Sequence, residues 1–109
     1  MLLERDADEN INFATTHSAD TSGASDGAAV IAVNTLFKVA AAYADDDVIA
    51  CVNGTLSAAD ATAAFPLGDN MTTVRVGADS AGAHWAGHIK RISYWPQRLE
   101  NEQLQALTV

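Results

Sequence analysis

Three residues of the chain have the chemistry of a carbohydrate-contacting set. Trp85 follows a loop of small residues, 78–83, and we expect its ring to be exposed. The apolar C–H face of a sugar stacks on an aromatic ring, which makes Trp85 the first candidate for contact with a ligand. His84 adjoins Trp85 at the same loop-to-strand junction, and Asn53 would supply a polar partner. The residue types therefore predict contact through Trp85, Asn53 and His84.

A run of three aspartates, Asp45, Asp46 and Asp47, could contribute to a calcium site. Hard cations bind clustered carboxylate oxygens, and Asp45 and Asp47 are the candidate ligands. Adjacent side chains in a strand-like turn point in different directions, however, and no further ligand spacing follows. We therefore expect a solvated hairpin tip. The histidines also lack a recognisable metal-ligand spacing, so the sequence predicts neither a metal nor another cofactor.

An acidic pattern near the start, Glu4-x-Asp6-x-x-Glu9, has the spacing found in some β-sandwich glycoside hydrolases. Alternation along a strand would place Glu4 and Asp6 on one face, as paired carboxylates require. The pattern lies close to the first residue, and the aromatic cleft that such enzymes use is absent. No Ser/His/Asp arrangement and no phosphate-binding glycine loop occurs elsewhere. We therefore expect no enzymatic activity, with a degenerate glycoside hydrolase as an alternative.

Composition limits the class of protein. The chain has 109 residues, 49% of them hydrophobic, which indicates a single globular domain spanning residues 1–109. Its net charge of −8 disfavours nucleic acid and anionic membranes as partners. No apolar run is long enough for a membrane span, and the early charges Glu4 and Arg5 indicate no signal peptide. Cys51, the single cysteine, lies in an apolar run and is expected to be buried and unreactive.

Short strand-like runs separated by turn residues indicate an all-β fold. Residues 45–47 and the dipeptide Asn53-Gly54 are expected turns, the second because both residues accept positive φ. Residues 17–27 are expected to form a loop, and residues 55–66 could be extended or weakly helical. A short helix is expected at the end, capped by Asn101, with Leu104 and Leu107 on its apolar face. The expected strands are residues 2–5, 10–15, 28–33, 36–43, 48–52, 72–76 and 84–95.

The last of these strands has an irregular apolar pattern. Ile89 and Ile92 are three apart, which breaks the alternation of a regular strand. A β-bulge at Lys90-Arg91 would return Ile92 and Tyr94 to the face of Ile89. The sequence therefore predicts one long bulged strand that ends at Pro96.

Three segments, in order, resemble a concanavalin A-like lectin/glucanase domain of the laminin-G-like kind. The first is Lys38-Val39-Ala40-Ala41-Ala42-Tyr43, an acidic turn, and a strand that ends in Asn53-Gly54. The second is Thr73-Val74-Arg75-Val76-Gly77. The third is Gly87-x-Ile89-x-x-Ile92-x-Tyr94-Trp95-Pro96-x-x-Leu99, followed by Glu102-x-Leu104-x-x-Leu107. Within that superfamily the chain is most similar to lectin-like modules of bacteriophage tail and head-fibre proteins.

The resemblance implies a compact two-sheet antiparallel jelly-roll-like sandwich with one short C-terminal helical turn. It also implies that Tyr94 and Trp95 are packing residues that hold this turn against the sheet. Domains of the family are about twice as long as this chain, so the N-terminal strands are missing or shortened, and Glu100 replaces the usual Ser or Asp cap. A shortened sandwich would expose apolar faces, and we therefore expect a homo-oligomer.

The resemblance implies a non-enzymatic, lectin-like carbohydrate-binding or assembly module of a phage or phage-derived particle. The expected ligand is a cell-surface glycan, and the expected location is a virion or extracellular particle surface. A purely structural, oligomeric virion protein that binds no sugar is the alternative. A glycan array separates these two functions.

Overall fold

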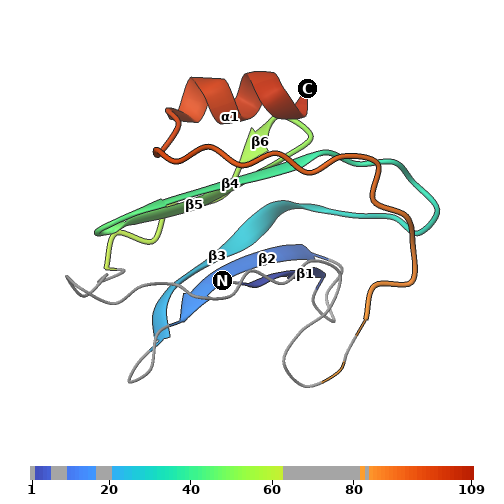
Figure 1. Ribbon diagram of the computed structural model, residues 1–109, viewed down its shortest axis with the longest axis horizontal. Coiled ribbons are helices and arrows are strands. Elements are labelled where there is room, and N and C mark those ends of the chain that lie inside the picture. The colour runs from blue at the N-terminus through green and yellow to red at the C-terminus, as the bar shows by residue number, and fades with distance from the viewer. Residues whose placement is uncertain (1, 6–9, 17–20, 63–81, 83) are drawn as a thin grey trace.

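The computed structural model describes residues 2–5, 10–16, 21–62, 82 and 84–109. Antiparallel strands and one short helix make up its regular structure (Figure 1), in agreement with the predicted all-β class. The elements are β1 (Leu2–Arg5), β2 (Asn10–Thr16), β3 (Thr21–Val30), β4 (Val39–Ala44), β5 (Asp47–Val52), β6 (Thr55–Leu56) and α1 (Asn101–Thr108). The helix in this part of the chain is too short to cross a membrane.

The first sheet has the order β1-β2-β3. β1 and β2 match the strands predicted at 2–5 and 10–15. The prediction of a loop was wrong for residues 21–27, which belong to β3 (Thr21–Val30), whereas residues 17–20 lie outside the described residues. The strand predicted over 28–33 is confirmed only for residues 28–30, where β3 ends. Residues of β3 such as Ser22, Gly23 and Asp26 have low strand propensity. Pairing with β2 overrides that local preference, because backbone hydrogen bonds do not depend on the side chain.

The second sheet has the order β4-β5-β6, so β4 lies at its edge. Ala44 pairs with Asp47 across a tight turn, in which Asp46 has a φ of 56°. Asn53 and Gly54 have φ values of 47° and 82°, as a two-residue hairpin turn between β5 and β6 requires. Both turns were predicted, whereas the short strand β6 fell in the segment whose conformation the sequence left open.

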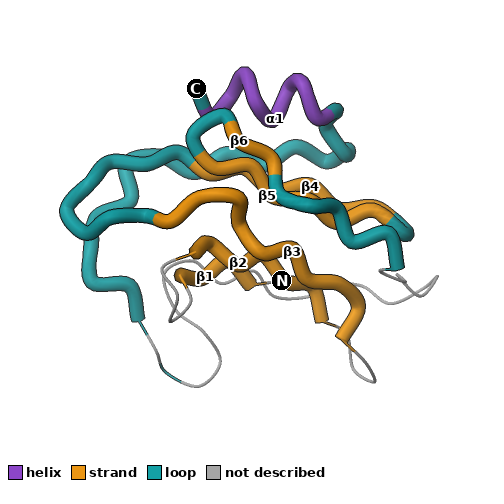
Figure 2. Tube along the Cα trace, turned by 180° about the vertical axis from the view of Figure 1, so that it is seen from behind, coloured by secondary structure: helices purple, strands orange, loops and turns teal. Residues whose placement is uncertain are grey.

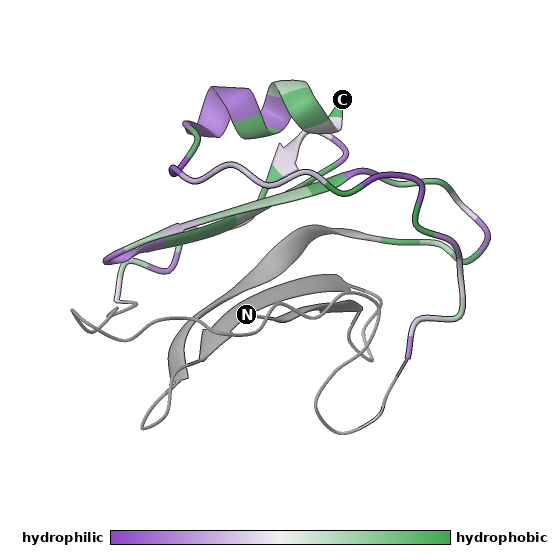
Figure 3. Ribbon diagram, in the orientation of Figure 1, coloured by the Kyte–Doolittle hydropathy of each residue, from purple (hydrophilic) through white to green (hydrophobic). Residues whose placement is uncertain are grey.

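β5 forms the centre of the described core, with every residue from Val48 to Val52 buried. On one face, Ile49 and Cys51 pack with Ala42 and with Leu104 of α1. On the other face, Val52 packs with Ile31, which follows β3. Figures 2 and 3 show β5 between the helix and the first sheet, with apolar residues along β4 and β5. Burial on both faces explains why this strand has a continuous apolar sequence.

The predicted long strand over residues 84–95 was wrong. Residues 88–95 run beside β4 without strand pairing, so no bulge is present at Lys90-Arg91 (Figure 1). The fraction of exposed surface is 71% for Tyr94 and 41% for Trp95. These two residues therefore do not serve as the buried packing pair predicted between helix and sheet. The smaller side chains of Leu99 and Leu104 occupy that position.

The helix occurs where it was predicted, but its cap differs. Glu100, with φ −66° and ψ 156°, is the N-cap, and its N–H donates to Oε1 of Gln103 at 2.9 Å. Asn101, the predicted cap, instead accepts a hydrogen bond from Arg98. Leu104 is buried as expected, whereas 44% of the surface of Leu107 is exposed. The sheet contacts a narrower stripe of this short helix than the leucine spacing suggested.

Candidate functional site

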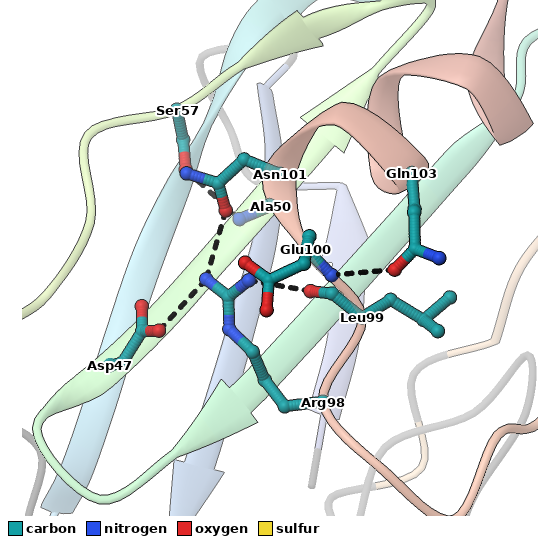
Figure 4. A network of polar contacts seen from close by, with 8 residues as sticks. All are labelled: Asp47, Ala50, Ser57, Arg98, Leu99, Glu100, Asn101 and Gln103. Atoms are coloured by element: carbon teal, nitrogen blue, oxygen red, sulfur yellow. Dashed lines mark hydrogen bonds and ion pairs between the residues drawn. The ribbon is translucent and has the colours of Figure 1, made fainter.

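Arg98 joins the start of α1 to the β4–β5 turn. Its Nη2 lies 2.8 Å from Oδ2 of Asp47 and 2.9 Å from Oδ1 of Asn101, and its Nη1 donates to the carbonyl oxygen of Leu99 (Figure 4). Only 18% of the Arg98 side chain is exposed, and its Nε has no partner among the described groups. Asp47, Glu100 and Asn101 also line an open, polar depression beside Arg98. These contacts fix the helix to the sheet and are structural.

A buried hydroxyl fixes the other end of the helix. Oγ1 of Thr108 accepts the N–H of Gly54 at 3.0 Å and donates to the carbonyl oxygen of Leu104 at 2.9 Å. The sulfur of Cys51 lies 3.1 Å from the same oxygen. Cys51 is fully buried, as predicted, and packs as a small core residue. This contact stabilises the helix on β5 and offers no accessible thiol for chemistry.

The structure places Trp85 against the core, which contradicts the expectation that its ring is exposed. The ring lies 5.9 Å from that of Phe37, centroid to centroid, at an interplanar angle of 75°. Trp85 also packs against the cluster of Ile31 and Val52 and is half-buried. An edge-to-face aromatic pair is a stable packing arrangement. The physical reason for the difference is that Ile31, Val52 and Phe37 form an apolar surface against which the indole packs.

The side chain of Asn53 has a structural role in the hairpin turn. Its Oδ1 accepts the backbone N–H of Lys38 at 2.9 Å, and the backbone N–H of Asn53 donates to the Lys38 carbonyl at 3.0 Å. Because Lys38 follows Phe37, the predicted pair of Asn53 and Trp85 does lie near the same end of β4. His84, the third predicted residue, is exposed. The set is thus partly brought together, but its two best candidates are engaged in turn formation and packing.

The three aspartates of the run differ in their exposure and contacts. Asp45 and Asp46 are exposed in the β4–β5 turn, whereas Asp47 binds Arg98. Among the residues described, no three His, Cys, Asp or Glu side chains are grouped as metal ligands. The described geometry fits the expected hairpin tip. In the hydrolase pattern, Asp6 and Glu9 lie outside the described residues, as does the expected strand at 72–76.

The surface feature that the sequence did not predict is the segment of residues 88–95, which we call the exposed strip and in which large apolar side chains alternate with polar ones at the surface. Exposed fractions are 43% for Ile89, 63% for Ile92, 71% for Tyr94 and 41% for Trp95. Lys90 and Arg91 are also exposed within it. The signal was present in the sequence as the broken alternation between Ile89 and Ile92. A segment with that irregularity fits poorly into a paired strand.

A tyrosine pair fixes one end of the exposed strip to β4. The side chain of Tyr94 forms a hydrogen bond with Tyr43, two residues before the acidic turn. Burial raises the pKa of the Tyr43 phenol above its usual value of 10.0, and the proximity and hydrogen bond of Tyr94 raise it further. The cations of the strip, Lys90 and Arg91, thus lie on the N-terminal side of Ile92, and the acidic turn lies near its C-terminal end.

Comparisons with known proteins show a similarity of fold and no similarity of sequence family. No family model and no curated protein matches the chain. Among solved structures, it is similar to a fragment, residues 221–444, of an S-layer domain-containing protein from Clostridium thermocellum, with a TM-score of 0.61 and 18% identity. The match covers 96% of this chain and 54% of that one, so the chain spans about half the length of the fragment. At this identity, the likeness concerns the arrangement of the backbone.

Proposed function

We propose that this chain is a non-enzymatic, lectin-like recognition and assembly module. In this proposal the two sheets form a compact, jelly-roll-like sandwich of the concanavalin A-like kind. The position of β5 between helix α1 and the first sheet supports this arrangement. The module acts through its outer surface and uses no cofactor.

The observation that carries the proposal is the exposed strip. Four large apolar side chains within residues 89–95 are at least 41% exposed. Contiguous apolar surface is costly in water, and in soluble proteins it marks sites of interaction. Two of the four are aromatic, and Lys90 and Arg91 lie among them. An open surface of this kind suits a broad partner such as a glycan chain or another protein.

We place the module on the surface of a phage-derived or cellular particle. The similar solved fragment comes from an S-layer domain-containing protein, which is consistent with a surface location. The resemblance in residues 38–107 to fibre modules of phages is consistent with a virion.

A glycan array tests the recognition role. The labelled chain is expected to bind a subset of surface glycans, and Tyr94→Ala and Trp95→Ala are each expected to weaken that binding. Leu36→Ala is the matched control, because Leu36 is 68% exposed but lies outside the strip. Binding that is lost equally in all three variants, or release of reducing sugar that depends on Glu4, would contradict the proposal.

A purely structural role is the second candidate. It is favoured by the engagement of Trp85 with Phe37 and of Asn53 with Lys38, because neither predicted sugar-contacting side chain is left for a ligand. An empty array combined with specific self-association would support this role and refute carbohydrate binding.

A further inference from the structure

We infer that the exposed strip pairs, antiparallel and about a two-fold axis near Ile92, with the same strip of a second copy of this chain. The inference rests on the assembly role proposed above and names the partner of that surface.

The backbone of the strip is open to a partner strand. Residues 88–95 run beside β4, the edge strand of its sheet, yet they form no strand pairing. In the described part of the chain, no backbone hydrogen bond joins the strip to another element. An extended segment with free N–H and C=O groups is a template for another strand. The same step would bring apolar side chains of the two strips, such as Ile89 and Trp95, beside each other.

The order of residues in the strip is self-complementary. In an antiparallel register centred on Ile92, Ile89 lies opposite Trp95 of the second copy. In the same register, Lys90 lies opposite Tyr94, where a cation can contact an aromatic ring. Arg91 lies opposite Ser93, a residue whose hydroxyl already accepts the Arg91 Nε–H within one chain at 3.2 Å. No two like charges are directly opposed, which favours this register.

Charge favours a second copy over an unrelated apolar partner. Lys90 and Arg91 lie on the N-terminal side of Ile92, and the Tyr94–Tyr43 contact places the C-terminal end of the strip near the acidic turn at 45–47. Antiparallel pairing brings the two cations of each copy toward the end of the other strip that lies near its acidic turn. A two-fold axis makes this contact twice, so that basic and acidic ends match on both sides.

A charge-exchange experiment tests the pairing. One variant carries Lys90→Glu and Arg91→Glu, and the other carries Asp45→Lys and Asp46→Lys. Each variant alone is expected to be monomeric by sedimentation, because like charges then meet at both ends. An equimolar mixture is expected to form a heterodimer, since each strip then faces a turn of opposite charge. Wild-type dimer should dissociate as salt concentration rises.

Cysteine crosslinking tests the register. Ile92→Cys is expected to form a disulfide-linked dimer under mild oxidation, because the symmetric register brings the introduced thiols of the two copies together. The native Cys51 is buried and does not interfere. Ala59→Cys, at an exposed position outside the strip, is the control and should crosslink far more slowly. Ile92→Asp is expected to weaken the dimer about tenfold or more.

Two results would overturn the inference: a wild-type chain that is monomeric at all concentrations, or a dimer that Ile92→Asp and the charge variants leave unchanged. The glycan array separates this outcome from failure of the proposed function. Glycan binding by a monomeric wild-type chain would refute the pairing and keep the recognition role. A dimer with an empty array would keep the pairing and refute carbohydrate binding.

Discussion

Replacement of Leu104 by alanine should remove much of the stability of this chain. Leu104 is 2% exposed and is the largest side chain that α1 contributes to the cluster with Ala42, Ile49 and Cys51. A Leu→Ala change in a core costs about 2–5 kcal/mol, depending on how far the neighbours can move into the cavity. Here Ala42 and Cys51 are small and are held by the β4–β5 ladder. We therefore expect a loss of about 3–4 kcal/mol.

That loss is a large part of the roughly 5–15 kcal/mol that stabilises a domain of this size. Urea unfolding followed by tryptophan fluorescence measures it, and the midpoint should fall by about 1.5–2 M for a slope near 2 kcal/mol per M. Leu107→Ala is the matched control in the same helix, since Leu107 is 44% exposed and should cost less than about 1 kcal/mol. Measurements at two protein concentrations separate folding from association. Equal losses for the two variants would refute the packing argument.

Three further predictions concern polar contacts. Arg98→Met should destabilise the chain by about 1 kcal/mol. A double-mutant cycle with Asp47→Asn should give a coupling energy that decreases in high salt, because Asp47 is 37% exposed. A coupling energy of zero would contradict a stabilising Arg98–Asp47 ion pair. Thr108→Val should cost about 1–3 kcal/mol, because it leaves the partly buried N–H of Gly54 without its acceptor, whereas Thr108→Ser should retain most of the stability. Equal losses of stability in the two variants would refute the role of the hydroxyl. Tyr94→Phe should lower the pKa of Tyr43 toward 10.0 yet leave it above that value because burial remains, as tyrosinate absorbance would measure. The raised pKa stabilises the fold below pH 10 and loses that effect as the pH rises through the folded-state value, so a Tyr43 titration unaffected by Tyr94→Phe would contradict the pairing.

Most of the second sheet could be predicted from the sequence because its signals are local. The continuous apolar run at 48–52 predicts a buried strand, and Asn53-Gly54 predicts the turn that follows it. The helix at the end also follows from leucine spacing. β3 could not be predicted, since Ser, Gly and Asp residues form a strand there only because β2 supplies a hydrogen-bonding partner.

For the candidate site, the sequence predicted which residues matter but not where their side chains lie. The sequence identified Trp85, Tyr94 and Trp95 as aromatic residues of interest, but it reversed their roles. Trp85 packs against Phe37, and the other two are exposed. The hydrophobicity of a side chain indicates that its burial is favourable, but it does not determine which of several apolar side chains fills a given space in the core. Leu99 and Leu104 fill the space beneath the helix and leave Tyr94 and Trp95 outside.

The sequence by itself determined the elements whose cause lies within a few residues: the β4–β5 hairpin, the Asn53-Gly54 turn, the buried Cys51 and helix α1. Only the tertiary structure decided the contacts between distant segments, such as Arg98 with Asp47 and Tyr94 with Tyr43. It also decided that residues 88–95 lie unpaired at the surface. The physical reason is that turn and helix preferences act along the chain, whereas strand pairing and burial depend on which surfaces meet after folding.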